Sequence, residues 1–272
     1  MTGTIATPDT LSLYDTEFPS RLFLGTARYP SPRVLEAAVE ASAPSFLTVS
    51  LRRQAAGHQE LAGQAFFDLL AAFKVPFLPN TAGCHSPEEV YATAMMAREL
   101  FETDWIKLEL IGDEDTLQPD TLGLVNTADR LLRQGFKVLP YCTEDLVLCR
   151  RLVDVGCRAV MPWAAPIGTG QGPLNGYALR VLRDRLTVPI IVDAGLGVPS
   201  HACQVMEWGL DGVLLNTAIA RAEDPVRLAL AFRRGVEAGR LAYLGGAMPP
   251  RETASASTPI LGTPFWHPAS PP

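Results

Sequence analysis

The stretch Trp105–Asp113, WIKLELIGD, alternates apolar and charged residues, which predicts a β-strand. Side chains of the same parity share one face of a strand, so Lys107 and Glu109 point one way and the isoleucine and leucines point the other. On a strand at a solvent-facing edge this polar face would be ordinary. If both faces of the strand are buried, a lysine and a glutamate lie side by side in the protein interior.

Seven further short apolar runs surround this strand, and stretches with helical periodicity separate them. Two of the helical stretches open on Ser-Pro, an N-cap followed by proline in the first turn, and SPEE also matches a capping box of Ser86 and Glu89. The eight predicted strands are RLFLGT (21–26), SFLTVSL (45–51), PFLPNT (76–81), WIKLELIG (105–112), KVLPYC (137–142), AVMPWA (159–164), PIIVDAG (189–195) and GVLLNTA (212–218).

Eight strands, each followed by a helix over about 200 residues, match the size and order of an α/β (β/α)8 TIM barrel. A doubly wound open sheet is the alternative, but its Gly-rich fingerprint is absent after the first strand, which ends in GTARYP. We therefore expect a single-domain barrel over residues 18–246 that forms the catalytic domain. Residues 1–17 are expected as an N-terminal lead-in, and residues 247–272 as an irregular tail rich in Pro and Ser.

Composition narrows the functional classes. The 272 residues carry a formal charge of −6, which gives no electrostatic case for binding nucleic acid or an anionic membrane. The five cysteines form no CxxC pair and the four histidines are scattered, so we expect no metal site and no disulfide framework. The sequence indicates no resident cofactor. The N-terminal residues do not resemble a secretory signal and no apolar run is long enough to span a membrane, so a cytoplasmic location is expected.

A closed parallel barrel gives each strand one face toward the helices and one toward the interior, so Lys107 and Glu109 are expected to point inward. One interpretation is a buried ion pair that fills the barrel. The other is an amine nucleophile that attacks a carbonyl to form a Schiff base, with the carboxylate moving protons. Asp193 ends an otherwise apolar strand, a position that is often catalytic in barrels, and it joins Lys107 and Glu109 as a candidate catalytic residue.

The loop PIGTGQG (166–172) follows the sixth strand and holds three glycines. Glycines let backbone N–H groups converge on an anion, although a flexible loop is the alternative interpretation. Barrels commonly bind phosphate at the loops after strands seven and eight, where this chain has turns at Ala194–Gly195 and Asn216–Thr217. The residues alone therefore predict an enzyme that forms an imine with a phosphorylated sugar ketone or aldehyde, and they do not name the reaction.

The chain also resembles the bacterial thiazole synthase family, which builds the thiazole phosphate of thiamine. The stretches that carry the resemblance span about residues 19–262 in order: SRLFLGT, LPNTAG, WIKLELIGD, GFKVLPY, MPWAAPIGTGQG, IIVDAGLGVPS, DGVLLNTAIA, VEAGRLAY and ASASTPILG. The resemblance implies that Lys107 forms an imine with 1-deoxy-D-xylulose 5-phosphate, with Glu109 and Asp193 as acid/base groups. It places the phosphate and sugar contacts on Gly168, Ala194, Gly195, Asn216 and Thr217.

The resemblance further implies a transferase reaction with protein partners. After the imine rearranges, a sulfur carrier protein would deliver sulfur from its C-terminal thiocarboxylate, and dehydroglycine would supply the C–N unit before water is lost and the ring closes to thiazole phosphate carboxylate. The implied partners are this carrier and, in some organisms, the dehydroglycine-forming enzyme. A homo-oligomer, often a homotetramer, is also implied.

The chain departs from the family pattern at several positions. Ala27 and Arg28 stand where many members have Gly-Lys, Thr169 stands where serine is usual, and Ala164 stands where glycine is common. Arginine cannot act as an amine nucleophile, which leaves Lys107 as the imine candidate. Two rivals remain open: another Schiff-base barrel such as an aldolase, which would need no sulfur carrier, and a binding scaffold without activity. A scaffold has no need to hold a buried amine beside carboxylates.

Overall fold

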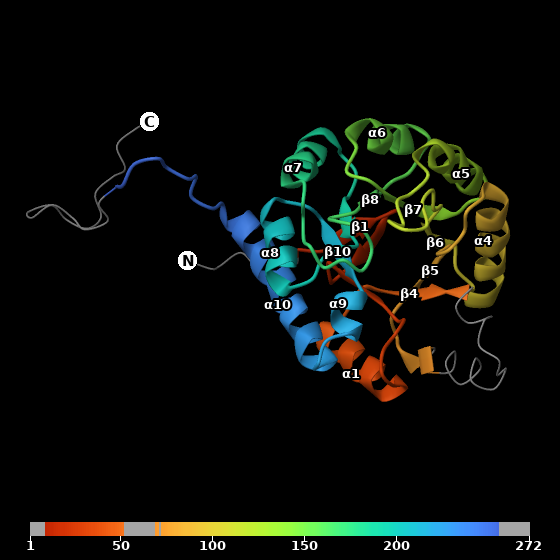
Figure 1. Cartoon of the computed structure of the whole chain (residues 1–272), viewed down its shortest axis with the longest axis horizontal. Helices are drawn as coiled ribbons and strands as arrows, with labels where there is room; N and C mark the ends of the chain where they lie inside the picture. The colour runs from red at the N-terminus through yellow and green to blue at the C-terminus, as the bar shows by residue number, and fades with distance from the viewer. Residues whose placement is uncertain (1–8, 52–68, 71, 256–272) are drawn as a thin grey trace, which may run out of the picture.

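The computed structural model describes residues 9–51, 69–70 and 72–255, and it contains the predicted (β/α)8 barrel (Figure 1). Its strands pair in parallel in the order β8-β7-β6-β5-β4-β3-β10-β9, and parallel bridges from Val160 to Ile190 and from Trp163 to Asp193 join β8 to β9. The barrel strands are β3 (Leu22–Gly25), β4 (Phe46–Ser50), β5 (Phe77–Asn80), β6 (Trp105–Leu108), β7 (Lys137–Cys142), β8 (Met161–Pro162), β9 (Ile191–Asp193) and β10 (Gly212–Leu215).

Helices surround the strands (Figure 1), and the predicted helix openings are confirmed. The side chains of Ser31 and Ser86 accept hydrogen bonds from the N–H groups of Val34 and Glu89, and proline occupies the first turn of both helices. The helices are α1 (Pro32–Ser42), α4 (Pro87–Phe101), α5 (Thr121–Arg133), α6 (Leu146–Asp154), α7 (Gly176–Arg185), α8 (Pro199–Glu207), α9 (Thr217–Ala220) and α10 (Pro225–Gly245). No helix of the described residues combines the length and apolarity needed to cross a membrane.

Only β7 has the predicted bounds; the other seven barrel strands are shorter than predicted, and two of them illustrate why. The run expected as a strand over 212–218 stops at Leu215, and α9 begins two residues later at Thr217. The run expected over 105–112 is a strand only to Leu108, although the inward and outward alternation of its side chains continues. In both places the apolar pattern continues past the last backbone hydrogen bond of the ladder, because the residues remain buried after the parallel pairing has ended.

A hairpin that the sequence pattern did not predict precedes the barrel. Strands β1 (Leu11–Leu13) and β2 (Thr16–Phe18) pair antiparallel, and β1 lies near the centre of the ring of helices in Figure 1. Its apolar side chains join the inward-facing barrel residues in one buried cluster, in which the rings of Phe18 and Phe46 lie 4.7 Å apart. The hairpin therefore fills the barrel at the end where the strands begin, and the opposite end is left for polar groups.

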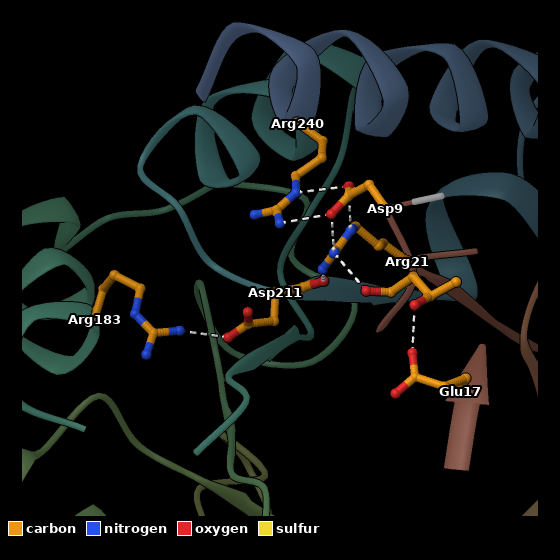
Figure 2. Close-up of polar contacts among 7 residues, drawn as sticks. Asp9, Glu17, Arg21, Arg183, Asp211 and Arg240 are labelled. Carbon is orange, nitrogen blue, oxygen red and sulfur yellow. Dashed lines mark hydrogen bonds and ion pairs between the residues drawn. The ribbon is translucent and has the colours of Figure 1, made fainter. Parts of the chain in front are cut away.

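An ion-pair cluster holds the N-terminal segment against the barrel (Figure 2). The carboxylate of Asp9 accepts hydrogen bonds from Arg240 at 2.8 and 2.9 Å and from Arg21 at 2.7 and 3.2 Å. These bonds, led by the one from Arg240, lower the pKa of Asp9 to about 2. Arg21 also donates to the backbone carbonyl of Asp211, whose side chain pairs with Arg183. The cluster thus ties Asp9 to Arg21, just before β3, and to α10, on the side of the barrel where β3 and β10 begin.

The boundaries expected for the lead-in, the barrel domain and the tail stay a prediction. Residues 247–255 leave the end of α10 without a helix or strand and are exposed (Figure 1). The part of the expected tail from residue 256 onward lies outside the described residues, as do residues 1–8 of the expected lead-in.

Candidate active site

Three charged side chains meet inside the barrel where the strands end. Lys107 Nζ lies 2.8 Å from Glu109 Oε1 and 2.7 Å from Asp193 Oδ2. Lys107 and Glu109 come from β6 and the residue just past it, and Asp193 ends β9 on another part of the barrel wall. All three are buried, with 5, 5 and 3% of their surface exposed. The structure therefore brings together the three predicted catalytic residues, and Lys107 and Glu109 point inward as the strand parity predicted.

The charges of this triad depend on one another. Burial opposes the charged form of Lys107 most strongly, but the carboxylates of Asp193 and Glu109 outweigh it, so the pKa of Lys107 lies above its ordinary value. Burial raises the pKa of Asp193, and the attraction to Lys107 offsets only part of that rise. The two carboxylates thus hold Lys107 as an ammonium, and Asp193 accepts a proton more readily than an exposed aspartate does.

Thr81 fixes the position of Glu109 and had no signal in the sequence. The strand ladder between β5 and β6 ends at the Asn80–Lys107 pair. Beyond it, the hydroxyl of Thr81 accepts from the N–H of Glu109 at 2.8 Å and donates to its carbonyl at 2.7 Å. One fully buried hydroxyl therefore replaces the missing backbone partner on both sides of Glu109. The Glu109 side chain is thereby held next to Lys107, although the β6 strand has already ended at Leu108.

Tyr141 forms part of the wall beside the triad. It is fully buried on β7, and its ring centroid lies 5.5 Å from Lys107 Nζ. Burial, together with the nearby charges of Asp193 and Glu109, raises the pKa of its phenol, so Tyr141 stays neutral. A neutral aromatic face at this distance favours a cation and excludes water from the amine.

The loops predicted to bind phosphate come together on the β8–β10 side of the mouth. Gly168 has a φ of +78°, and a Cβ placed on it would lie 3.9 Å from the side chain of Thr217. Ala194 and Gly195 have φ of +63° and +74° and follow Asp193 directly. A Cβ on Gly195 would lie 2.5 Å from Ala165, so the two loops touch there. Backbone groups of Gly168, Ala194, Gly195 and Thr217 therefore lie near one another.

Asn216 faces a different part of the mouth from the other predicted contact residues. With its amide nitrogen turned toward the β3 end, Asn216 donates to the carbonyls of Ala27 at 2.9 Å and Gly25 at 3.1 Å. Gly25 is required at this contact, because a Cβ there would lie 2.5 Å from the Cβ of Asn216. Asn216 therefore links the turn before α9 to the segment after β3.

A cavity of about 400 Å³ opens on this side of the mouth, under the ends of β3, β4 and β5, and we call it the β3–β5 cavity. It lies next to the triad, because its lining residue Asn80 pairs with Lys107 across the parallel ladder. The cavity is lined by residues 25–32, Leu35, Thr48, Ser50, Asn80 and Asn216.

Fold and site together define a class: a (β/α)8-barrel enzyme with a buried lysine between two carboxylates at the C-terminal mouth of the strands. Within the part of the chain that the structure describes, no group of three His, Cys, Asp or Glu residues is arranged to hold a metal ion.

Comparison with known proteins names the family. The profile described as "Thiazole biosynthesis protein ThiG" matches residues 12–259. The thiazole synthases of Variovorax paradoxus and Ralstonia nicotianae are each 67% identical to this chain, and the alignments cover 98% of it and 99 and 97% of theirs. A chain from the crystal structure of the Amycolatopsis orientalis BexX/CysO complex is 28% identical with a TM-score of 0.79, covering 89% of this chain and 98% of that one. The protein belongs to the ThiG family of thiazole synthases and acts in thiamine biosynthesis.

Proposed function

We propose that Lys107 forms an imine with 1-deoxy-D-xylulose 5-phosphate and that Glu109 and Asp193 move the protons of the reaction. The single observation that supports this most is the buried triad, in which the ammonium of Lys107 lies within 2.8 Å of two carboxylates. The amine must lose a proton before it can attack the ketone carbon. Asp193, whose pKa burial raises, is suited to accept it.

The imine step follows from this arrangement. The Lys107 nitrogen adds to the ketone carbon, and the carbonyl oxygen leaves as water after a neighbouring carboxyl group returns a proton to it. A carboxylate then removes a proton from the next sugar carbon to give an enaminol, and return of a proton to the former imine carbon leaves the carbonyl one carbon along the chain. Glu109 and Asp193 flank the same nitrogen, so both are within reach of the carbons attached to it.

The phosphate is proposed to bind where the loops after β8, β9 and β10 meet, at Gly168, Ala194, Gly195 and Thr217, with Asn216 at the edge of this group. Successive backbone N–H groups in left-handed conformations, as at Ala194 and Gly195, suit an anion. In this arrangement the sugar chain extends from the phosphate on the β8–β10 side of the mouth to Lys107 on β6. The β3–β5 side is then left for the other reactants.

The sulfur donor is proposed to be the C-terminal thiocarboxylate of a small carrier protein, with dehydroglycine as the source of the C–N unit. The similarity to a chain of the BexX/CysO complex supports a protein partner at this fold. A dehydroglycine-forming enzyme as a second partner and a homotetramer stay predictions of the family resemblance, and a cytoplasmic location stays a prediction from the sequence.

Reconstitution tests the proposal. The purified protein is incubated with the sugar phosphate, the carrier thiocarboxylate, and glyoxylate with ammonium, which form the imine in solution, and thiazole phosphate carboxylate is measured by mass spectrometry. We expect product only in the complete mixture and none with Lys107→Ala. Cleavage or joining of carbon–carbon bonds without the carrier would support an aldolase instead. Turnover by Lys107→Ala at the wild-type rate would refute the covalent role of the lysine.

A further inference from the structure

We propose that the β3–β5 cavity binds the carboxylate of the small imino acid that is condensed with the sugar phosphate, and that Arg28 is its cationic partner. The inference deepens the proposed function and rests on it for the identity of the ligand. A cavity of about 400 Å³ has room for such a molecule and several waters, since one water occupies about 30 Å³ in the liquid.

The position of the cavity fits a second reactant. Asn80 lines it and pairs with Lys107 on the neighbouring strand, and adjacent strands lie about 4.8 Å apart. The imino nitrogen has to reach the sugar carbon that Lys107 holds, and the carboxylate of the same molecule lies two bonds from that nitrogen. The carboxylate must therefore lie within a few ångströms of Lys107. The loops proposed for phosphate lie on the β8–β10 side, and of the residues proposed there Asn216 alone is among those that line the cavity, so most of the cavity is left for a second reactant.

The charges of the cavity favour an anion. Among the described residues that line it there is no aspartate or glutamate, and Arg28 is the basic side chain. The Tyr29 hydroxyl is buried and has no hydrogen-bond partner within the described residues, which costs free energy unless a ligand supplies one. Burial raises the pKa of Tyr29, so this hydroxyl keeps its proton and is a donor. Arg28 therefore offers a carboxylate in this cavity a charged hydrogen-bond donor.

The backbone at Arg28 supports a functional role for this side chain. Arg28 has a φ of +70°, a left-handed conformation that costs a residue other than glycine about 1 kcal/mol. The amide of Asn216 binds the carbonyls of Gly25 and Ala27 and so fixes the segment in this conformation. The chain therefore retains an arginine at the rim of the cavity where a glycine would be less strained.

Oxamate is the probe for this site. It has a carboxylate next to a carbon that carries nitrogen, but it has no aldehyde or imine that could react with Lys107. Binding of oxamate to the full-length protein is measured by calorimetry for wild type, Arg28→Gln and Arg28→Lys. Arg150→Gln is the control, because Arg150 is exposed on α6 and does not line the cavity.

We expect Arg28→Gln to weaken oxamate binding by about tenfold, the loss of one charge-assisted hydrogen bond. Arg28→Lys should restore most of the affinity, and Arg150→Gln should match wild type. No binding to the wild type, or equal binding to wild type and Arg28→Gln, would overturn the inference. If Arg28→Gln instead weakens the binding of a peptide made from the last few residues of the carrier and leaves oxamate binding unchanged, Arg28 contacts the carrier and the inference is overturned.

A second readout separates this inference from the proposed function. Borohydride trapping of the sugar phosphate on Lys107 should proceed equally well in wild type and Arg28→Gln. Loss of trapping in Arg28→Gln would assign the arginine to the sugar phosphate and overturn the inference. If the wild type forms no trapped adduct but binds oxamate through Arg28, the carboxylate site stands and the proposed imine chemistry fails.

Discussion

Replacing Asp193 by asparagine should lower the pKa of Lys107 and thereby shift the pH dependence of imine formation. The attraction between the two charges at 2.7 Å amounts to about 6 kcal/mol at an effective dielectric constant of about 20. This corresponds to about four pKa units at about 1.4 kcal/mol per unit. Glu109 stays at 2.8 Å, and the asparagine carbonyl still accepts a hydrogen bond. Both keep part of the stabilisation of the ammonium, so the fall should be smaller than this upper bound.

The assay is the initial rate of borohydride trapping with 1-deoxy-D-xylulose 5-phosphate as a function of pH. The amine attacks only when neutral, so the rate rises as Lys107 loses its proton. Removing a carboxylate destabilises the ammonium, and the midpoint of this rise should move to lower pH in Asp193→Asn. Asp184→Asn, on the exposed side of α7, is the matched control and should keep the wild-type midpoint. An unchanged or higher midpoint in Asp193→Asn would refute the electrostatic reasoning.

Three further predictions concern stability, measured as the free energy of unfolding in urea. Thr81→Val leaves two buried backbone groups without partners and should cost about 2 kcal/mol or more, whereas Thr127→Val removes only one bond within a helix and should cost under about 1 kcal/mol. A Cβ added at Gly195 would lie 2.5 Å from Ala165, whereas a Cβ added at Gly83, where φ is similar, would meet no atom within 4 Å. Gly195→Ala should therefore cost more stability than Gly83→Ala, and equal costs would contradict this. Because the folded pKa of Asp9 is about 2, its ion pairs contribute stability at neutral pH that is lost as pH falls from about 4 toward 2, and Asp9→Asn should remove this part of the acid dependence.

The sequence predicted the barrel because its strands differ clearly from its helices in periodicity. It did not predict the β1–β2 hairpin, because each strand has only three residues and the segment is polar overall. Leu11, Leu13 and Phe18 enter the core only because the barrel encloses a space for them. That space is a property of the closed barrel and has no local signal.

The candidate site was predictable to the extent that strand parity determines it. The alternation around Lys107 and Glu109 indicated that both face the interior. Asp193 was identified by its place at a strand end, but its 2.7 Å contact with Lys107 depends on closure of the barrel between distant strands. Thr81 was not predicted, because a threonine at the end of a strand is common and its two hydrogen bonds depend on where the β5–β6 ladder ends.

The central claim is that Lys107 is the nucleophile, and the chain allows a direct test because it has only three lysines. The protein is treated with 1-deoxy-D-xylulose 5-phosphate and borohydride, and the adduct is located by peptide mass spectrometry. Lys74→Ala, which removes an exposed lysine ahead of β5, is the matched control for Lys107→Ala. We predict one adduct, on the peptide containing Lys107, that persists in Lys74→Ala and is absent in Lys107→Ala. A folded wild-type protein that forms no adduct would contradict the claim, and the triad would then be a buried salt bridge.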